Sequence, residues 1–212
     1  MTEEDNFEQV CDQYKRLVWD CDYSIGPEAS IYKGPRPPPD ETTYQLLETT
    51  KTKFLQLLKQ ETDVHRLYSL YEKFIKTSIT EMEVFIVKRI AELLSPHPLL
   101  YVYIAGDLIT IGEEEEAYEY FQRAKRLDPK LKDVLYLQLG CAMIWKDSKG
   151  IQSTVDQILT SYPNDCVGLK AEVRLKENPN DPFYNFGIPE LSSSANLRTV
   201  LRTMGVLGEG GK

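Results

Sequence analysis

The residues most able to do chemistry in this chain are its two histidines and four cysteines. His65 lies where a helix is expected to begin and His97 lies between two prolines, and neither has an acid or a nucleophile beside it in the sequence. The cysteines lack the CxxC spacing of a zinc or redox site; they are Cys11, Cys21, Cys141 and Cys166. The sequence also lacks a glycine-rich phosphate loop and the GxSxG and HExxH signatures. It therefore predicts no catalytic residues, no metal and no cofactor.

Charged clusters allow other interpretations. Glu113–Glu116 form an acidic run, which we interpret as a solvated helix start favoured by the helix dipole, because successive helical residues point in different directions. A basic cluster follows: Arg123, Lys125, Arg126, Lys130 and Lys132. It lacks interleaved aromatic residues, so it is a weak signal for nucleic acid, and a nucleic-acid-associated complex subunit that uses this helix face is the alternative function. A thiol-dependent enzyme using Cys11 or Cys21 beside Asp20 and Asp22 is a less favoured alternative.

Length and composition limit the class of protein. The chain has 212 residues, a net charge of −8 and 42% hydrophobic residues, which is enough for the core of one domain with extensions. It has no run of about 18 apolar residues that would span a membrane. Its acidic start, MTEEDNFEQ, lacks the apolar stretch of a signal peptide. We therefore expect a soluble intracellular protein, cytoplasmic or nuclear, and the acidic balance disfavours general binding of nucleic acid.

The stretch 98–131 has the pattern of two antiparallel helices joined at Gly112. Its first helix is apolar on almost all sides. The second helix carries small, aromatic and aliphatic residues on one face, at spacings of four, three and three: Ala117, Phe121, Ala124 and Leu127. Pro129 ends this helix, because the residue before a proline is pushed out of the helical region. The small residues predict a close approach by a neighbouring helix.

This hairpin resembles the tetratricopeptide repeat, a helix–turn–helix unit of about 34 residues. The positions that match the family pattern are Tyr101, Ile104, Ala105, Leu108, Gly112, Ala117, Phe121, Ala124 and Pro129. The family's usual tryptophan and tyrosine are replaced, so the chain resembles a divergent member. The resemblance implies an all-α fold, a short right-handed α-solenoid of TPR-like helix hairpins.

A second repeat is expected over 132–165, because Pro163 follows Pro129 by one repeat length. A second apolar face is formed by Ile151, Val155, Ile158 and Leu159. The Leu139–Gly140 pair falls one position late against the family pattern, which predicts a shortened turn around Ser148–Gly150. A third unit, which ends near Pro96, fits poorly in its first half.

The N-terminal part is predicted to be an irregular helical layer. Residues 1–22 have the pattern of an amphipathic helix, which either docks on its own domain or binds a partner. Its apolar face comprises Phe7, Val10, Cys11, Tyr14, Leu17 and Val18. Residues 23–40 are Pro-rich and predict a linker or a ligand for a proline-recognising domain. Further helices are expected over 41–60, over 64–77 and from a capping box, Ser78 with Glu81, to about Leu94.

The C-terminal part is predicted to close the helical domain, which spans 41–178. Residues 166–177 are expected to form a short helix that ends the stack. Residues 179–212 are a C-terminal extension, with aromatic residues at 183–191, a last helix at 192–204 and a frayed end.

The resemblance also implies a binding surface on the first helix of each repeat. The family's best-known mode grips a terminal carboxylate, but the matching positions here are apolar or small, so we do not expect that mode. The predicted partner-binding residues are Leu99, Val102, Gly106, Ile109, Val134, Leu137, Cys141, Ile144 and Trp145. Because soluble proteins rarely expose large apolar patches, we expect this groove to be covered by Phe183–Leu191, by the N-terminal helix or by a partner. The sequence thus predicts a non-catalytic adaptor or complex subunit that buries a partner protein's helix or peptide in a TPR-like groove.

Overall fold

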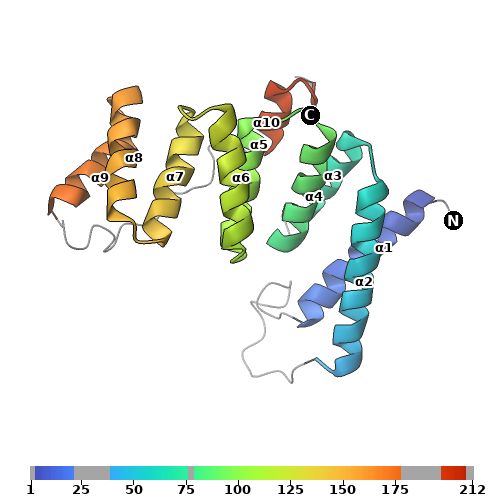
Figure 1. Ribbon diagram of the computed structural model, residues 1–212. Helices are drawn as coiled ribbons and strands as arrows, with labels where there is room; N and C mark the ends of the chain where they lie inside the picture. The colour runs from blue at the N-terminus through green and yellow to red at the C-terminus, as the bar shows by residue number, and fades with distance from the viewer. Residues whose placement is uncertain (1–2, 22–38, 76–78, 178–196, 209–212) are drawn as a thin grey trace. The chain divides into compact units, whose positions relative to one another are not determined.

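The computed structural model describes residues 3–21, 39–75, 79–177 and 197–208, and all regular secondary structure in these ranges is helical (Figure 1). The predicted all-α class is therefore confirmed for the described part of the chain. Within the same ranges, no helix combines the length and the apolar character needed to cross a bilayer. The chain divides into two compact units, Met1–Leu94 and Ser95–Lys212.

The first unit contains four helices among the described residues: α1 (Glu3–Cys21), α2 (Glu41–Gln60), α3 (Val64–Phe74) and α4 (Thr80–Leu93). Helix α1 packs on α2, and α4 packs on both α2 and α3. Asp40 and Asp63 cap α2 and α3 by accepting hydrogen bonds from backbone N–H groups in the first turn. The Pro-rich segment lies almost wholly outside the described residues.

Helix α1 is docked on its own unit. Five of its six predicted face residues are buried: Phe7, Val10, Cys11, Tyr14 and Leu17. The ring of Phe54 on α2 lies 6.2 Å from the ring of Phe7 and 5.6 Å from that of Tyr14. The structure therefore agrees with a helix that docks on its own domain.

The Glu81 carboxylate of α4 joins three helices of this unit. The Tyr14 hydroxyl donates to Glu81 Oε2 at 3.0 Å, and Lys51 Nζ lies 2.5 Å from Glu81 Oε1. Helix α4 begins after Ile79, which caps it with no side-chain hydrogen bond, and Ser78 lies outside the described residues. The predicted capping box thus falls partly outside the described residues, and the described partners of the Glu81 carboxylate lie on α1 and α2.

The second unit contains six helices among the described residues: α5 (Pro98–Thr110), α6 (Glu114–Leu127), α7 (Lys132–Ile144), α8 (Ser148–Ser161), α9 (Cys166–Glu177) and α10 (Leu197–Thr203). Helices α5 and α6 form one hairpin, and α7 and α8 form the next. Helix α7 packs against both α5 and α6, α9 packs against α8, and α10 packs against α5.

The helix bounds recur at one repeat length, the period of the tetratricopeptide pattern. Both bounds of α7 follow those of α5 by this length, and both bounds of α8 follow those of α6 by the same length. Helix α9 begins one repeat length after α7 begins. In the first unit, α3 begins one repeat length before α5, and both bounds of α4 precede those of α6 by the same length. The poorly fitting upstream segment therefore has helix bounds in the same register as the two clear hairpins.

This register corrects the predicted second turn. Helices α7 and α8 are joined by Trp145–Asp147, which is as long as the Ile111–Glu113 connection and is not shortened. Ser148 already belongs to α8. Leu139 follows Ala105 by one repeat length, so the Leu139–Gly140 pair corresponds to Ala105–Gly106. The family match made from the sequence had used Ile104–Ala105, one position earlier.

Both hairpins turn through the same hydrogen-bonded cap. After α5, Gly112 has φ +83°; its N–H donates to the Ile109 carbonyl, and the N–H of Glu113 donates to the Leu108 carbonyl. This is the Schellman arrangement, which needs a left-handed residue after the helix. After α7 the same two bonds recur, and the left-handed position is held by Lys146, with φ 54°.

Lys146→Gly is therefore expected to stabilise the protein, by up to about 1 kcal/mol, because a side chain in the left-handed region costs about 1–2 kcal/mol and the added backbone freedom of glycine offsets part of the gain. Gly112→Ala is the matched reverse change and is expected to destabilise by about 1 kcal/mol. Urea unfolding of the two variants measures both. Destabilisation by Lys146→Gly would show that its side chain stabilises the turn more than its conformation costs.

Two buried clusters hold the second unit together. The first lies between α5, α6 and α7 and comprises Val102, Ala105, Phe121, Ala124, Val134, Leu137 and Cys141. The second lies between α7, α8 and α9 and comprises Leu135, Leu139, Ala142, Ile151, Val155, Ile158 and Ala171. The predicted apolar faces of α6 and α8 thus form the core beside their neighbouring helices. The exception is Leu127, which was predicted on the face of α6 but is 47% exposed, because it is the last residue of that helix.

Asp165 ties α9 to α7. Its Oδ1 accepts hydrogen bonds from the N–H groups of Val167 (3.0 Å) and Gly168 (2.9 Å) at the start of α9. Its Oδ2 accepts from the Tyr136 hydroxyl at 2.6 Å and lies 2.5 Å from Lys132 Nζ. One buried carboxylate therefore satisfies the start of one helix and the polar side chains of another.

Candidate protein-binding surface

Four of the predicted partner-binding residues are core residues. The side chains of Val102, Val134, Leu137 and Cys141 are buried together with Phe121 of α6. The groove predicted from the sequence is thus filled at these positions by the chain itself, as expected for helices that are apolar on most sides. Four others are only half-buried: Leu99, Gly106, Ile109 and Ile144.

The C-terminal extension contributes one packed helix among the described residues. Helix α10 packs on α5 and buries Leu197, Val200 and Leu201 completely. Phe183–Leu191, which the sequence suggested as the cover, lies outside the described residues.

Trp145 is the one predicted residue that remains well exposed, at 44%. Its ring lies 5.3 Å from that of Tyr118, centroid to centroid, at an angle of 69°, the edge-to-face arrangement favoured by aromatic rings. Tyr118 is also 44% exposed. We call these two side chains the aromatic patch. Sequence reasoning missed Tyr118, and the available signal was its place on α6 beside Ala117, just off the buried face.

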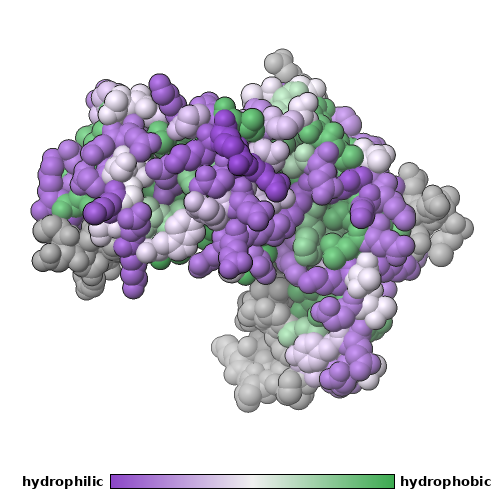
Figure 2. Space-filling model, in the orientation of Figure 1, coloured by the Kyte–Doolittle hydropathy of each residue, from purple (hydrophilic) through white to green (hydrophobic). Residues whose placement is uncertain are grey.

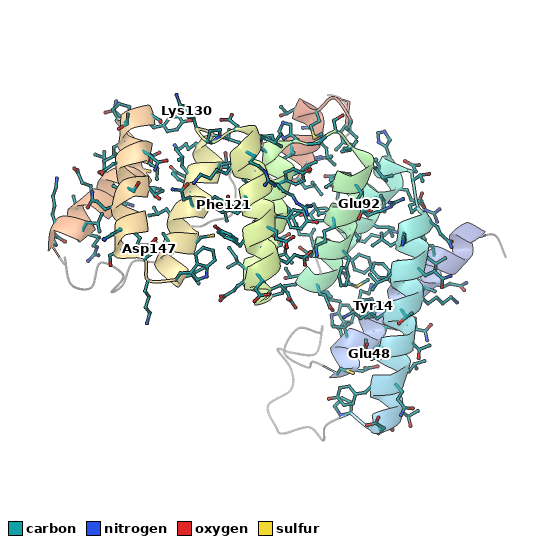
Figure 3. The ribbon with its side chains drawn as sticks, viewed as in Figure 1. Tyr14, Glu48, Glu92, Phe121, Lys130 and Asp147 are labelled. Carbon is teal, nitrogen blue, oxygen red and sulfur yellow. The ribbon has the colours of Figure 1, made fainter. Side chains whose placement is uncertain are left out.

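The aromatic patch rests on the core. The ring of Tyr118 lies 6.1 Å from that of buried Phe121, and Trp145 caps the C-terminal end of α7. Figure 3 labels Phe121 and Asp147, which locate α6 and the turn that follows Trp145. The patch is therefore held by two neighbouring helices, one from each hairpin.

One edge of the aromatic patch is acidic. Glu113, Glu114 and Glu115 are exposed at the start of α6, about one turn before Tyr118. The positive end of the helix dipole favours negative charge there. A partner with basic residues beside an apolar side chain would match this edge.

The basic cluster is partly engaged within the chain. Arg123 forms an ion pair with Glu119 at 3.7 Å and lies 4.8 Å from the centre of the Tyr120 ring. Lys132 pairs with Asp165, and Lys125 lies 5.7 Å from the centre of a core ring, that of Phe121. Three of the five basic side chains thus have partners inside the protein, which weakens the case for a phosphate-binding face.

The cysteine environments do not favour thiolate chemistry. Burial, followed by the negative charge of Asp12, raises the pKa of the Cys11 thiol to about 12. Burial and Asp20 also raise the pKa of Cys21, and burial raises that of Cys141 to about 12. Since the thiolate is the nucleophile, these thiols are poorly suited to nucleophilic catalysis near neutral pH. A metal-binding group of His, Cys, Asp or Glu side chains was also not found within the described ranges.

Alkylation of the native protein should therefore start at Cys166, which is exposed, and leave Cys11 and Cys141 unmodified until unfolding. Mass spectrometry after timed treatment with iodoacetamide measures the order. Alkylation of Cys11 in the native protein at the rate of Cys166 would contradict the packing of α1.

Comparison with protein-family models, curated proteins and solved structures finds no match to this chain.

Proposed function

We propose that this chain is a non-catalytic protein-binding adaptor or complex subunit, built as a right-handed TPR-like stack of helix hairpins, and that the aromatic patch contacts its partner. The regular register of the helix bounds and the match of small and aromatic residues in α6 support the resemblance. Fold alone does not assign function, so the proposal depends on the surface.

The observation that carries the proposal is the exposed pair of Tyr118 and Trp145. Tyrosine and tryptophan dominate the binding energy of many protein interfaces, since they bury a large area and lose little side-chain entropy. Here they are positioned by packing against α6 and α7, while hydrophilic residues cover most of the visible face over α6 and α8 in Figure 2. An ordered aromatic pair within a polar surface is typical of an interface centre.

The partner is a helix or an extended peptide that presents an apolar side chain with lysine or arginine close to it. The apolar side chain would cover the aromatic patch, and the basic residues would lie near Glu113–Glu115. The competing function, contact with nucleic acid through the basic cluster, has less support because Arg123, Lys125 and Lys132 already have internal partners.

The test is affinity purification with Tyr118→Ala/Trp145→Ala, quantified by mass spectrometry against the unchanged chain. We expect at least one partner to fall by about tenfold or more, as loss of interface hot spots predicts. Leu127→Ala is the matched control, because Leu127 is similarly exposed on α6 but lies outside the patch. If the double variant melts at the wild-type temperature and retains every partner in full, the patch is not the binding surface.

A further inference from the structure

Helix α9 begins one repeat length after α7, so it corresponds to the first helix of a further hairpin. One of its faces packs against α7 and α8. Ala171 is buried in the cluster between α7, α8 and α9, with Val167 and Leu175 packed against it. Gly168 allows the close approach, because a Cβ there would lie 2.8 Å from Ile158 Cγ2 and 2.9 Å from Leu159 Cδ2. This face of α9 is complete.

The other face of α9 is apolar and exposed. Leu169 and Val173, four residues apart on one side of the helix, are 43% and 49% exposed. Hydrophobic atoms reach the surface at the α9 end of the second unit in Figure 2.

The register shows what covers this face in a complete hairpin. The residues one repeat length earlier are Leu135 and Leu139, which are 1% and 0% exposed because α8 packs on them through Ile151, Val155 and Ile158. In the α5–α6 hairpin, Ala105 lies one repeat length before Leu139, and it packs with Phe121 of α6. A second helix therefore covers this face on both α5 and α7.

The corresponding second helix for α9 would fall at positions 182–195, one repeat length after α8. That part of the sequence contains Pro182, Gly187 and Pro189 and lies outside the described residues. Repeat stacks that end without a neighbour need a polar outer face on the last helix. Leu169 and Val173 give α9 the opposite character.

We propose that α9 receives an amphipathic helix from a partner protein, in the place that α6 and α8 take on α5 and α7. By correspondence with α7, the incoming helix would carry apolar residues spaced like Ile151, Val155 and Ile158 of α8. Exposed Lys170 borders the exposed apolar face and favours an acidic residue at the edge of the incoming helix. This surface is separate from the aromatic patch, so it adds a second partner contact to the proposed function.

The probe is a synthetic peptide with the α8 sequence, residues 148–161, held helical by a covalent link between positions 149 and 153, both exposed in the protein. Binding to the full chain is followed by two-dimensional ¹H–¹⁵N NMR. We expect shifts centred on α9 and a loss of affinity of about tenfold or more with Leu169→Glu/Val173→Glu. A peptide carrying Val155→Asp should not bind, and Tyr118→Ala/Trp145→Ala should leave peptide binding unchanged, which separates this result from the test of the aromatic patch.

Three results would overturn the proposal. The first is a lack of shifts on α9 at millimolar peptide, or binding that Leu169→Glu/Val173→Glu does not weaken. The second is a chain that sediments as a dimer only while Leu169 and Val173 are present, which would make a second copy the occupant. The third is a fall in the unfolding midpoint of the free chain with Leu169→Glu/Val173→Glu, which would show that the chain covers this face itself.

Discussion

Replacing Phe121 with alanine is expected to destabilise the second unit by about 3–5 kcal/mol, the usual cost of removing a buried phenylalanine ring. The ring lies in the cluster between α5, α6 and α7, so the cavity would open where the two hairpins meet. Denaturant unfolding, followed by circular dichroism, measures the change.

Leu127→Ala is the control for this prediction, because Leu127 is on the same helix and exposed. Its substitution should change the free energy of unfolding by no more than about 0.5 kcal/mol. A loss below about 1 kcal/mol for Phe121→Ala would mean that the hairpins do not pack through this residue.

Asp165→Ala is expected to cost about 2–4 kcal/mol, from a lost helix cap and lost hydrogen bonds. The substitution removes the cap of α9, which is worth about 1 kcal/mol, and leaves the Tyr136 hydroxyl and two N–H groups without their acceptor. Asp156→Ala on the exposed face of α8 is the matched control and should be nearly neutral. Equal stability of the two variants would show that Asp165 does not link α7 to α9.

Because of the Asp165 carboxylate, we also expect the free energy of unfolding to fall at low pH. Burial alone would raise the pKa of Asp165, but hydrogen bonds from Lys132, Tyr136 and Gly168 hold it below its usual value. A carboxyl group with a lowered folded-state pKa contributes stability above the unfolded-state value, about 3.9, and loses it as the pH falls toward the folded value. Unfolding free energies of Asp165→Asn and of the unchanged chain should therefore converge as the pH falls below about 4, and parallel curves would contradict this.

The helices were predictable from sequence because their signals are local. The bounds expected for α2 and α9 agree with the structure, and Gly112 lies in the turn between α5 and α6, where the sequence placed the junction. Ala117, Phe121 and Ala124 are buried as their spacing required.

The functional surface was less predictable, because periodicity identifies an apolar face but not what covers it. Val102 and Cys141 satisfied the pattern of a groove, yet neighbouring helices bury them. Tyr118 and Trp145 are far apart in the sequence and meet only because α6 and α7 pack together. Glu81 similarly gained its partners from helices distant in sequence.

In the second repeat, aligning the Leu139–Gly140 pair one residue off led to a wrong prediction for the turn. The Leu139–Gly140 pair suggested a shortened turn, but the helix bounds keep the repeat spacing and Lys146 takes the place of the turn glycine. The left-handed conformation of Lys146 could not be recognised from the sequence, because residues other than glycine seldom adopt it.

Partner binding at the aromatic patch is measured most directly by photo-crosslinking in cells, with p-benzoylphenylalanine placed at position 118 and separately at position 127. We expect a crosslink from position 118 to another protein, at a peptide that contains an apolar residue beside lysine or arginine, and little or none from position 127. Equal crosslinking from both positions, or none from position 118 in a chain that is folded and expressed, would contradict a partner-binding role for the aromatic patch.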